Sequence, residues 1–273
     1  MDQTEARKKE EIEFHDRLRG EELAKDSRLY KHYHSNSKFY SVDRANRKLC
    51  ETWIQTKCPG KRLLDFCCGD GEYSLAAARA GAQTTGIDIS EVAVRKSAER
   101  ARVENLTNVQ FLVRDAEATG FEDRSFDLIL CAGVLHHLDL DHAYPELARL
   151  LAPGGEILCM EPLRYNPVFQ WYRRLTPHLR TAYETDHILR MKDIHKAKKY
   201  FRNVDLNFFH LTTLAAVPFR NTPLFSSLLS FFENIDSVLM RIPWIQRLAW
   251  MAIFKLSDPI CDEQGKSPLK RAP

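Results

Sequence analysis

The chain has 273 residues, enough to bury one substantial core in one or two domains. Its content of 44% hydrophobic and 28% charged residues is typical of a globular protein and excludes a disordered or fibrous chain. The formal net charge of +3 implies no particular partner, but the charge is unevenly distributed. Residues 163–257 contain 14 Lys and Arg against 6 Asp and Glu, a basic excess that acidic residues elsewhere nearly cancel.

The cysteines and the N-terminal segment indicate in which cellular compartment the protein is found. Seven cysteines are scattered along the chain without Cys-x-x-Cys spacing, which favours reduced thiols in the core over disulfides or a zinc site. The N-terminal segment is charged and lacks an apolar signal region. The longest uncharged stretch, residues 206–219, is too short to cross a bilayer as a helix. We therefore expect a cytoplasmic protein without a metal site.

The first 48 residues predict an N-terminal arm. Residues 1–29 alternate charges and indicate an exposed helix or a partly ordered arm. Residues 30–48 are crowded with aromatic side chains, which either pack on the main domain or form a lid over an active site. In the second case, the residues that contact the substrate include Tyr30, Tyr33 and Tyr40.

From Lys61 onward, short apolar runs alternate with helical patterns. Ser90 is the expected N-cap of one helix, and Gly81 follows the end of the helix before it. The expected strands are residues 62–66, 84–89, 109–115, 126–133 and 156–162; the expected helices are 73–80, 91–104 and 143–151. Five strands with intervening helices predict an α/β fold with a doubly wound, mostly parallel sheet, of which residues 49–162 form the core.

The remaining residues, 163–273, predict a C-terminal region that completes the fold and contributes to substrate specificity. Residues 163–225 are irregular in pattern, and two apolar helices are expected at 224–242 and 244–256. Their apolar side chains either pack on the sheet and cover a hydrophobic pocket, or make peripheral contact with a membrane surface. The basic run 190–202 is typical of a solvated helix face, so no nucleic acid partner is expected.

A cluster of small and acidic residues marks a binding site at the carboxyl ends of the strands. The run Leu63-Leu64-Asp65-Phe66-Cys67-Cys68-Gly69-Asp70-Gly71 ends a strand in a turn of small residues that opens a helix. Such a turn lets the backbone approach a ligand. Asp88 ends the next strand, where a carboxylate can bind a ribose diol, although it could instead cap the following helix. Asp115 ends the third strand in the same way.

These residues resemble the class I S-adenosylmethionine (SAM) dependent methyltransferases, and the resemblance covers residues 60–162. The family pattern Asp-x-Gly-x-Gly-x-Gly is matched from Asp65 to Gly71, with Cys67 in place of the first glycine. The resemblance implies that SAM binds here, with S-adenosylhomocysteine as product. It assigns the methionine part to Asp65, Cys67, Cys68, Gly69, Gly71, Cys131 and Ala132, the ribose to Asp88, and the adenine to Asp115 and Ala116. Ile89, which follows Asp88, is also among the implied cofactor residues. A nicotinamide site is disfavoured, because no third glycine follows Gly71 at the required spacing.

Methyl transfer is an in-line displacement that requires alignment and, for some acceptors, a base. The candidates for catalysis are His136, Glu161 and Tyr165, near the ends of the fourth and fifth strands. We expect His136 to face the acceptor. His137 either packs within the fold or contacts substrate, and a structural role for both histidines remains an alternative.

The acceptor is only broadly constrained. The Asn/Asp-Pro-Pro-Tyr/Phe signature of certain amino methyltransferases is absent after the fourth strand. We expect a small or hydrophobic acceptor of the lipid, quinone, glycan or thiol type. The alternative is a SAM-binding regulatory or scaffold protein without methyl transfer; the oligomeric state stays open.

Overall fold

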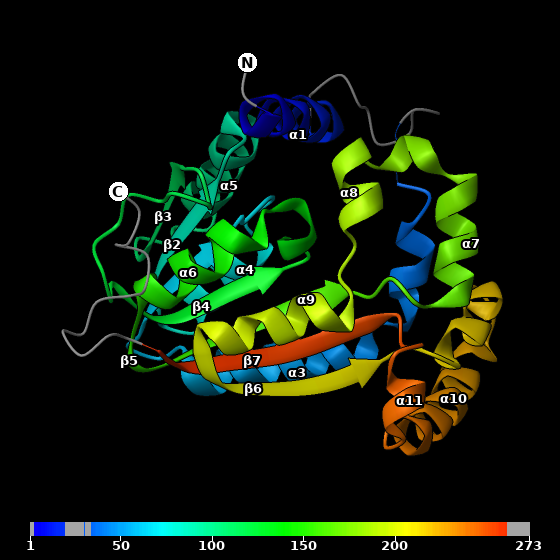
Figure 1. The fold of residues 1–273 in the computed structure, drawn as a ribbon. Coiled ribbons are helices and arrows are strands. Elements are labelled where there is room, and N and C mark those ends of the chain that lie inside the picture. Colours follow the sequence, from blue (N-terminus) through cyan, green and yellow to red (C-terminus); the bar gives the residue numbers. More distant parts are fainter. Residues whose placement is uncertain (1–2, 20–29, 31–33, 261–273) are drawn as a thin grey trace.

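The computed structural model describes residues 3–19, 30 and 34–260. Within them, a seven-stranded sheet has the order β3-β2-β1-β4-β5-β7-β6 (Figure 1). Strands β1 to β5 pair in parallel, whereas β7 is antiparallel to both of its neighbours. The strands are β1 Arg62–Phe66, β2 Gln83–Asp88, β3 Val109–Val113, β4 Phe126–Ala132, β5 Leu151–Pro162, β6 Phe201–Phe209 and β7 Met251–Pro259. The predicted doubly wound, mostly parallel sheet is confirmed.

Helices cover both faces of this sheet (Figure 1). The α-helices are α1 Gln3–Arg19, α3 Arg44–Lys57, α4 Glu72–Arg79, α5 Glu91–Val103, α6 Leu140–Leu150, α7 Pro167–Leu175, α8 Ala182–His187, α9 Met191–Lys196, α10 Phe225–Leu239 and α11 Pro243–Gln246. Short 3-10 helices are η1 Ser37–Val42, η2 Leu135–His137, η3 Pro177–Leu179, η4 Ala197–Lys199 and η5 Thr213–Phe219.

The core lies on both sides of the central strands because successive side chains of a strand point to opposite faces. In β1, Leu64 joins a cluster with α6 and α9, and Leu63 joins a second cluster with α3 and α4. Both leucines are fully buried. From Leu63 to Phe66 every residue of β1 is buried, as expected for a strand covered on both faces.

Local signals place the helices that flank the predicted binding site. The hydroxyl of Ser90 accepts a hydrogen bond from the amide of Ala93, so the predicted N-cap of α5 is confirmed. α4 ends one residue earlier than expected, at Arg79. α6 begins at Leu140 and accommodates Pro145 within it.

The prediction of a helix at residues 244–256 is wrong. Only Pro243–Gln246 is helical there, and Met251–Pro259 is strand β7. β7 lies between β5 and β6, so its first residues are buried on both faces and form a continuous apolar run. Such a run cannot be distinguished from a buried helix by periodicity alone. The helix expected at 224–242 is confirmed as α10, and β6 lies in the stretch expected to be irregular.

Of the two alternatives for the N-terminal segment, an exposed helix or a partly ordered arm, the structure has the helix, but this helix is docked on the domain. Helix α1 lies across the carboxyl edge of the sheet, in dark blue at the top of Figure 1, and Glu11 is 7% exposed. Its hydrophobic pattern is weak because it docks through charged and hydrogen-bonding side chains, as described below. In the part of the chain that the structure describes, no helix has the length and apolar character needed to span a membrane.

Candidate active site

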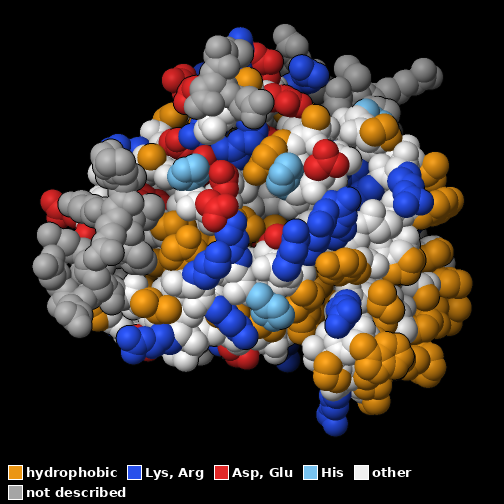
Figure 2. All heavy atoms as spheres, viewed as in Figure 1, with side chains coloured by type: hydrophobic (Ala, Val, Ile, Leu, Met, Phe, Trp, Pro, Cys, Tyr) orange, Lys and Arg blue, Asp and Glu red, His pale blue; other side chains and the backbone are white. Residues whose placement is uncertain are grey.

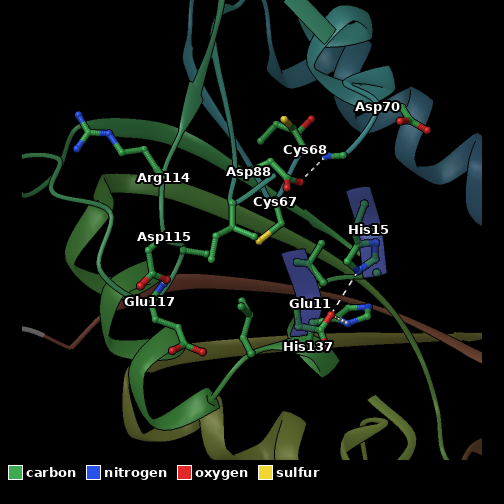
Figure 3. A pocket seen from close by; sticks show the side chains of 18 of the residues that line it. Glu11, His15, Cys67, Cys68, Asp70, Asp88, Arg114, Asp115, Glu117 and His137 are labelled. Carbon is green, nitrogen blue, oxygen red and sulfur yellow. Dashed lines mark hydrogen bonds and ion pairs between the residues drawn. The ribbon is translucent and has the colours of Figure 1, made fainter. Parts of the chain in front are cut away.

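Two cavities lie at the carboxyl edge of the parallel strands, where open α/β sheets bind ligands. The first has a volume of about 300 Å³ and lies between the strand ends and α1 (Figure 3). Its lining includes the predicted cofactor residues Asp65, Cys67, Cys68, Gly69, Asp88, Ile89, Asp115, Ala116 and Ala132. The second has a volume of about 400 Å³ and is lined by residues of η1, α3, α7 and the β4 end.

The loop after β1 keeps the conformation expected of a glycine-rich turn. Cys67 has φ 61°, a left-handed conformation that glycine adopts without cost and other residues rarely adopt. The departure from the family pattern therefore changes the side chain and preserves the backbone shape. At Gly71, a Cβ atom would lie 2.7 Å from the Ser97 hydroxyl. Gly71 lines neither cavity, so its role is close packing of the loop against α5.

Two buried acids hold this loop. Asp88 accepts hydrogen bonds from the amides of Gly69 and Ser90, both at 2.9 Å. Its carboxylate thus links the β1 loop to the start of α5 while facing the first cavity. Asp65 is 2% exposed and accepts a hydrogen bond from the Ser74 hydroxyl at 2.6 Å. Burial raises the pKa of Asp65 to about 6, against the effect of the Ser74 hydrogen bond.

Helix α1 forms the roof of the first cavity through ion pairs with the strand ends. Arg7 contacts both carboxylate oxygens of Glu117 at 2.6 and 2.7 Å and also bonds the carbonyl of His137. Lys8 Nζ lies 2.6 Å from Asp115 Oδ2. These pairs are largely shielded from solvent, so they are stronger than ordinary surface pairs. Sequence reasoning missed this role of α1, since charge alternation is equally typical of an exposed helix.

Glu11 and His15 of α1 form a cluster with His137 of η2 (Figure 3). Glu11 Oε2 lies 3.0 Å from His137 Nδ1 and 3.4 Å from His15 Nε2, and Glu11 also accepts a hydrogen bond from Thr181. Although burial opposes both changes, the contact lowers the pKa of Glu11 and raises that of His137. Burial lowers the pKa of His15. The cluster therefore fastens α1 to η2 and to the N-terminus of α8.

The same three side chains could geometrically hold a divalent cation, because one ligand atom from each lies within 4.8 Å of the others. A metal-bound histidine usually donates its second ring nitrogen to an acceptor. Nδ1 of His15 is buried and has no hydrogen-bond partner among the described residues. Glu11 and His137 already contact each other, and Glu11 also binds Thr181, without a metal ion. We therefore interpret the cluster as the contact that holds α1 on the domain.

A buried carboxylate orients His136 toward the second cavity. His136 Nδ1 lies 2.7 Å from Glu161 Oε2. The other oxygen of Glu161 accepts the amides of Val134 and Leu135, both at 2.8 Å. Glu161 is fully buried and lines neither cavity, so it acts through His136 rather than on a ligand. When Nδ1–H donates to Glu161, Nε2 is left as an acceptor on the cavity side.

The structure places the remaining candidates in different surroundings. His136, His137 and Tyr40 line the second cavity, and His137 lines the first as well. Tyr165 is 41% exposed and lines neither cavity, so we do not retain it as a catalytic candidate. Cys131 is fully buried against Cys159 on β5.

The predicted aromatic lid is only partly described. The ring of Tyr30 stacks on His34 and lines neither cavity. Tyr33 lies outside the described residues. Phe39 is 8% exposed and packs against Phe169 and Trp250. Most of the described part of this segment therefore packs on the main domain, while Tyr40 reaches the second cavity.

Comparison with known proteins identifies the fold around these cavities. Residues 63–155 match the family described as "Methyltransferase domain". The chain is 31% identical to a demethylmenaquinone methyltransferase of Bacillus cytotoxicus over 107 residues, which cover 38% of this chain and 45% of that protein. It is 35% identical to one of Staphylococcus aureus over 116 residues, covering 41% and 47%. The match thus spans about half the length of these relatives.

Residues 63–155 form a class I SAM-dependent methyltransferase domain. Solved structures share the fold beyond this segment. Haemonchus contortus phosphoethanolamine N-methyltransferase 2, in complex with phosphomonomethylethanolamine and S-adenosylhomocysteine, aligns with TM-score 0.55 and 19% identity over 79% of this chain and 53% of that chain. A geranyl diphosphate methyltransferase with its substrate and sinefungin gives TM-score 0.54 and 17% identity, covering 79% and 78%. The 4+2 cyclase SpnF gives 0.51 and 23%, covering 80% and 82%.

The first cavity suits SAM, which carries a sulfonium and an ammonium group. Its lining includes Asp65, Asp88, Asp115 and Glu117, and two of these, Asp115 and Glu117, are paired with α1 cations. Asp65 is buried, which raises its pKa, and it makes no ion pair among the described residues; the ammonium group of SAM would supply a cation there. A volume near 300 Å³ lies at the lower end of the usual range of about 300–1,000 Å³ for ligand pockets.

Proposed function

We propose that the chain transfers a methyl group from SAM in the first cavity to a small acceptor in the second. The observation that carries this proposal is the shared wall of the two cavities: His15, Tyr73, Ala132, Gly133 and His137 line both. A donor and an acceptor in adjoining cavities meet the geometric demand of an in-line displacement. The second cavity combines aromatic and apolar side chains, among them Phe169, Trp250 and Met160, with charged and polar ones.

In this proposal His136 acts as the general base for an acceptor that loses a proton. SAM supplies the electrophilic methyl group when bound. His136 Nε2 accepts the proton, and Glu161, held by two backbone amides, keeps the ring oriented and stabilises the imidazolium that forms. Glu184 Oε1 lies 4.0 Å from His136 Nε2 and adds to this stabilisation.

The test separates donor binding from transfer. Calorimetric titration should show that SAM and S-adenosylhomocysteine bind the wild type and bind Asp88→Ala much more weakly, because Asp88 fixes the loop and faces the first cavity. A screen of small amphiphilic acceptors with S-adenosylhomocysteine release as readout then tests transfer. Binding without release by any acceptor would favour a scaffold function of the same fold, and no binding at all would refute the proposal.

We propose further that the helices beside the second cavity rest on a membrane surface. Trp171 and Trp244 are 66% and 67% exposed, and Figure 2 shows apolar side chains gathered over the side where Figure 1 places α7, α10 and α11. Other large exposed apolar side chains here are Val168, Leu175, Phe219, Leu224, Phe231, Val238 and Leu248. Apolar patches of this kind are uncommon on monomeric proteins, and nearby exposed arginines at 241 and 247 suit anionic headgroups.

Vesicle co-sedimentation tests this contact. Vesicles of phosphatidylcholine with phosphatidylglycerol should retain the wild type at low salt and release the double variant Trp171→Ser with Trp244→Ser. Val103, 67% exposed on α5 away from this patch, offers the control Val103→Ser, which should bind as the wild type does. Equal sedimentation of all three proteins would refute the membrane contact.

A further inference from the structure

The second cavity contains two arginine side chains at one end. Arg173 lies on α7, and Arg180 lies between η3 and α8. The Arg180 side chain is 7% exposed; its Nη1 donates to the carbonyl of Thr176 at 2.9 Å, and its Nε lies 3.4 Å from Glu184 Oε1. Arg180 is therefore a buried but partnered cation.

Arg173 is different, because its guanidinium lacks close acceptors. Its Nε is buried and has no hydrogen-bond partner among the described residues. Its Nη1 lies 3.5 Å from the carbonyl of Leu163, at the outer limit for a hydrogen bond. Burial, and then the neighbouring Arg180, lower the pKa of Arg173 to about 10. A buried charge without a partner is strongly disfavoured unless a ligand supplies the counter-charge.

The two acids that line this cavity, Glu184 and Asp43, form no ion pair with Arg173. Glu184 is shared, since its Oε1 lies 3.4 Å from Arg180 Nε and 4.0 Å from His136 Nε2. Asp43 also lines the cavity; its Oδ1 is buried without a hydrogen bond among the described residues, 3.5 Å from His210 Nε2, and it makes no ion pair with either arginine. Among the described residues, Glu184 is the one carboxylate within 4.0 Å of either guanidinium, and it pairs with Arg180 and not with Arg173.

We propose that these two arginines bind an oxyanion of the acceptor, a carboxylate or a phosphate, an inference that rests on the proposed methyl transfer. Planar guanidinium groups match both anions through paired N–H donors. Beside them, the rings of Phe169 and Trp250 stack with centroids 4.2 Å apart and form an apolar wall. The acceptor class is thus a small amphiphilic acid, with its acid group at Arg173 and its apolar body along these rings.

The alternative role for Arg173 is packing, since its guanidinium lies 5.8 Å from the ring of Phe169. The two roles predict opposite effects of Arg173→Met, which keeps the apolar stem and removes the charge. If Arg173 holds the fold, this substitution lowers the melting temperature. If it serves a ligand, the substitution leaves the melting temperature unchanged or raises it, because a buried unpaired charge is removed.

The experiment uses phenyl phosphate and benzoate as probes, with benzyl alcohol as the uncharged comparison, titrated calorimetrically into the full chain with S-adenosylhomocysteine. We expect one or both acids to bind and benzyl alcohol to bind far more weakly. Arg173→Met should weaken acid binding about tenfold or more, the usual effect of losing a charged hydrogen bond. The matched control is Arg174→Met, an exposed neighbour on α7 that lines neither cavity and should bind as the wild type does.

Each outcome decides the proposal. Tighter binding of phenyl phosphate assigns a phosphate acceptor, and tighter binding of benzoate assigns a carboxylate. No acid binding, equal binding of benzyl alcohol, or undiminished binding by Arg173→Met would overturn the oxyanion site. S-adenosylhomocysteine binding is measured separately by titration of the free protein, so that failure of the donor site is seen apart from failure of the oxyanion site.

Discussion

The buried carboxyl of Asp65 should lower the stability of the free protein while it favours the binding of SAM. The substitution Asp65→Asn tests both effects. The substitution keeps the side-chain shape and an oxygen that can accept the Ser74 hydroxyl, now 2.6 Å from Asp65 Oδ2. It removes a charge that burial disfavours, as the rise of the Asp65 pKa to about 6 shows. Without a bound donor, the variant should therefore be more stable than the wild type.

The magnitude follows from the pKa difference between the two states. A rise from about 3.9 in the unfolded chain to about 6 in the fold corresponds to about 3 kcal/mol of destabilisation at pH 7, an upper bound. Above pH 6 the carboxyl is ionised in both states, so the penalty is complete. Between about pH 6 and 4 only the folded state binds the proton, so the penalty falls, and it vanishes below about pH 4. For a chain of this size, 1–3 kcal/mol raises the melting temperature by about 3–10 °C.

Thermal unfolding at pH 7 and at pH 4.5, with calorimetric titration of SAM, measures both effects. We expect the variant to melt higher at pH 7, to lose most of that gain at pH 4.5, and to bind SAM more weakly. Asp127→Asn is the control, because Asp127 pairs with Arg62, which lowers its pKa, and this substitution should destabilise slightly. A lower melting temperature for Asp65→Asn at pH 7, or unchanged SAM affinity, would refute the reasoning.

Three further predictions concern the His136–Glu161 pair, the docking of helix α1 and the loop after β1. His136→Gln should lower turnover by about 10²–10⁴-fold with little change in SAM affinity. Glu161→Gln should lower turnover and also shift the pH profile of turnover. Unchanged turnover of His136→Gln in steady-state assays would exclude His136 as the base. The stabilisation from the Glu11–His137 pair should be complete between about pH 4.5 and 6.5, the ordinary pKa values of the two groups. It should be lost as the pH falls through the lowered pKa of Glu11 or rises through the raised pKa of His137. Amide exchange in α1, corrected for intrinsic rates, should rise toward pH 8.5 in the wild type and be fast and less pH-dependent in Glu11→Gln. Cys67→Val should destabilise by about 1–3 kcal/mol because a β-branched residue fits φ 61° poorly, whereas Cys67→Gly should change the free energy of unfolding by less than about 1 kcal/mol; denaturant titrations showing equal effects would contradict this.

The sequence predicts the parallel half of the fold well because its signals there are local. Strand β1 is found with its bounds, and Ser90 caps α5 as expected. Each feature depends on side chains within a few residues of it, such as an apolar run or a cap. The resemblance to the methyltransferases also predicts the first cavity, since most of the cofactor residues it assigns line that cavity.

The missed features depend on contacts between residues far apart in the chain. The apolar run that becomes β7 is a strand because β5 and β6 flank it, which no local pattern reveals. The role of α1 depends on Arg7 meeting Glu117 and on Glu11 meeting His137 across more than a hundred residues. A partial signal did exist: Arg7, Glu11 and His15 recur every four residues and so share one face of the helix.

The acids that hold α1 over the first cavity also line the predicted SAM site, so the docking of α1 and the binding of SAM involve the same groups. Asp115, which the resemblance assigns to the adenine, is paired with Lys8, and the neighbouring Glu117 is paired with Arg7. A SAM adenine that donates a hydrogen bond to Asp115 would compete with Lys8 of α1 for this carboxylate. The contact between Glu11 and His137 lies beside the wall that the two cavities share. In the proposed reaction, the helix that encloses SAM therefore contacts both cavities. Because His137 lines both cavities and pairs with Glu11 of α1, we expect the binding of donor and acceptor to be linked through α1.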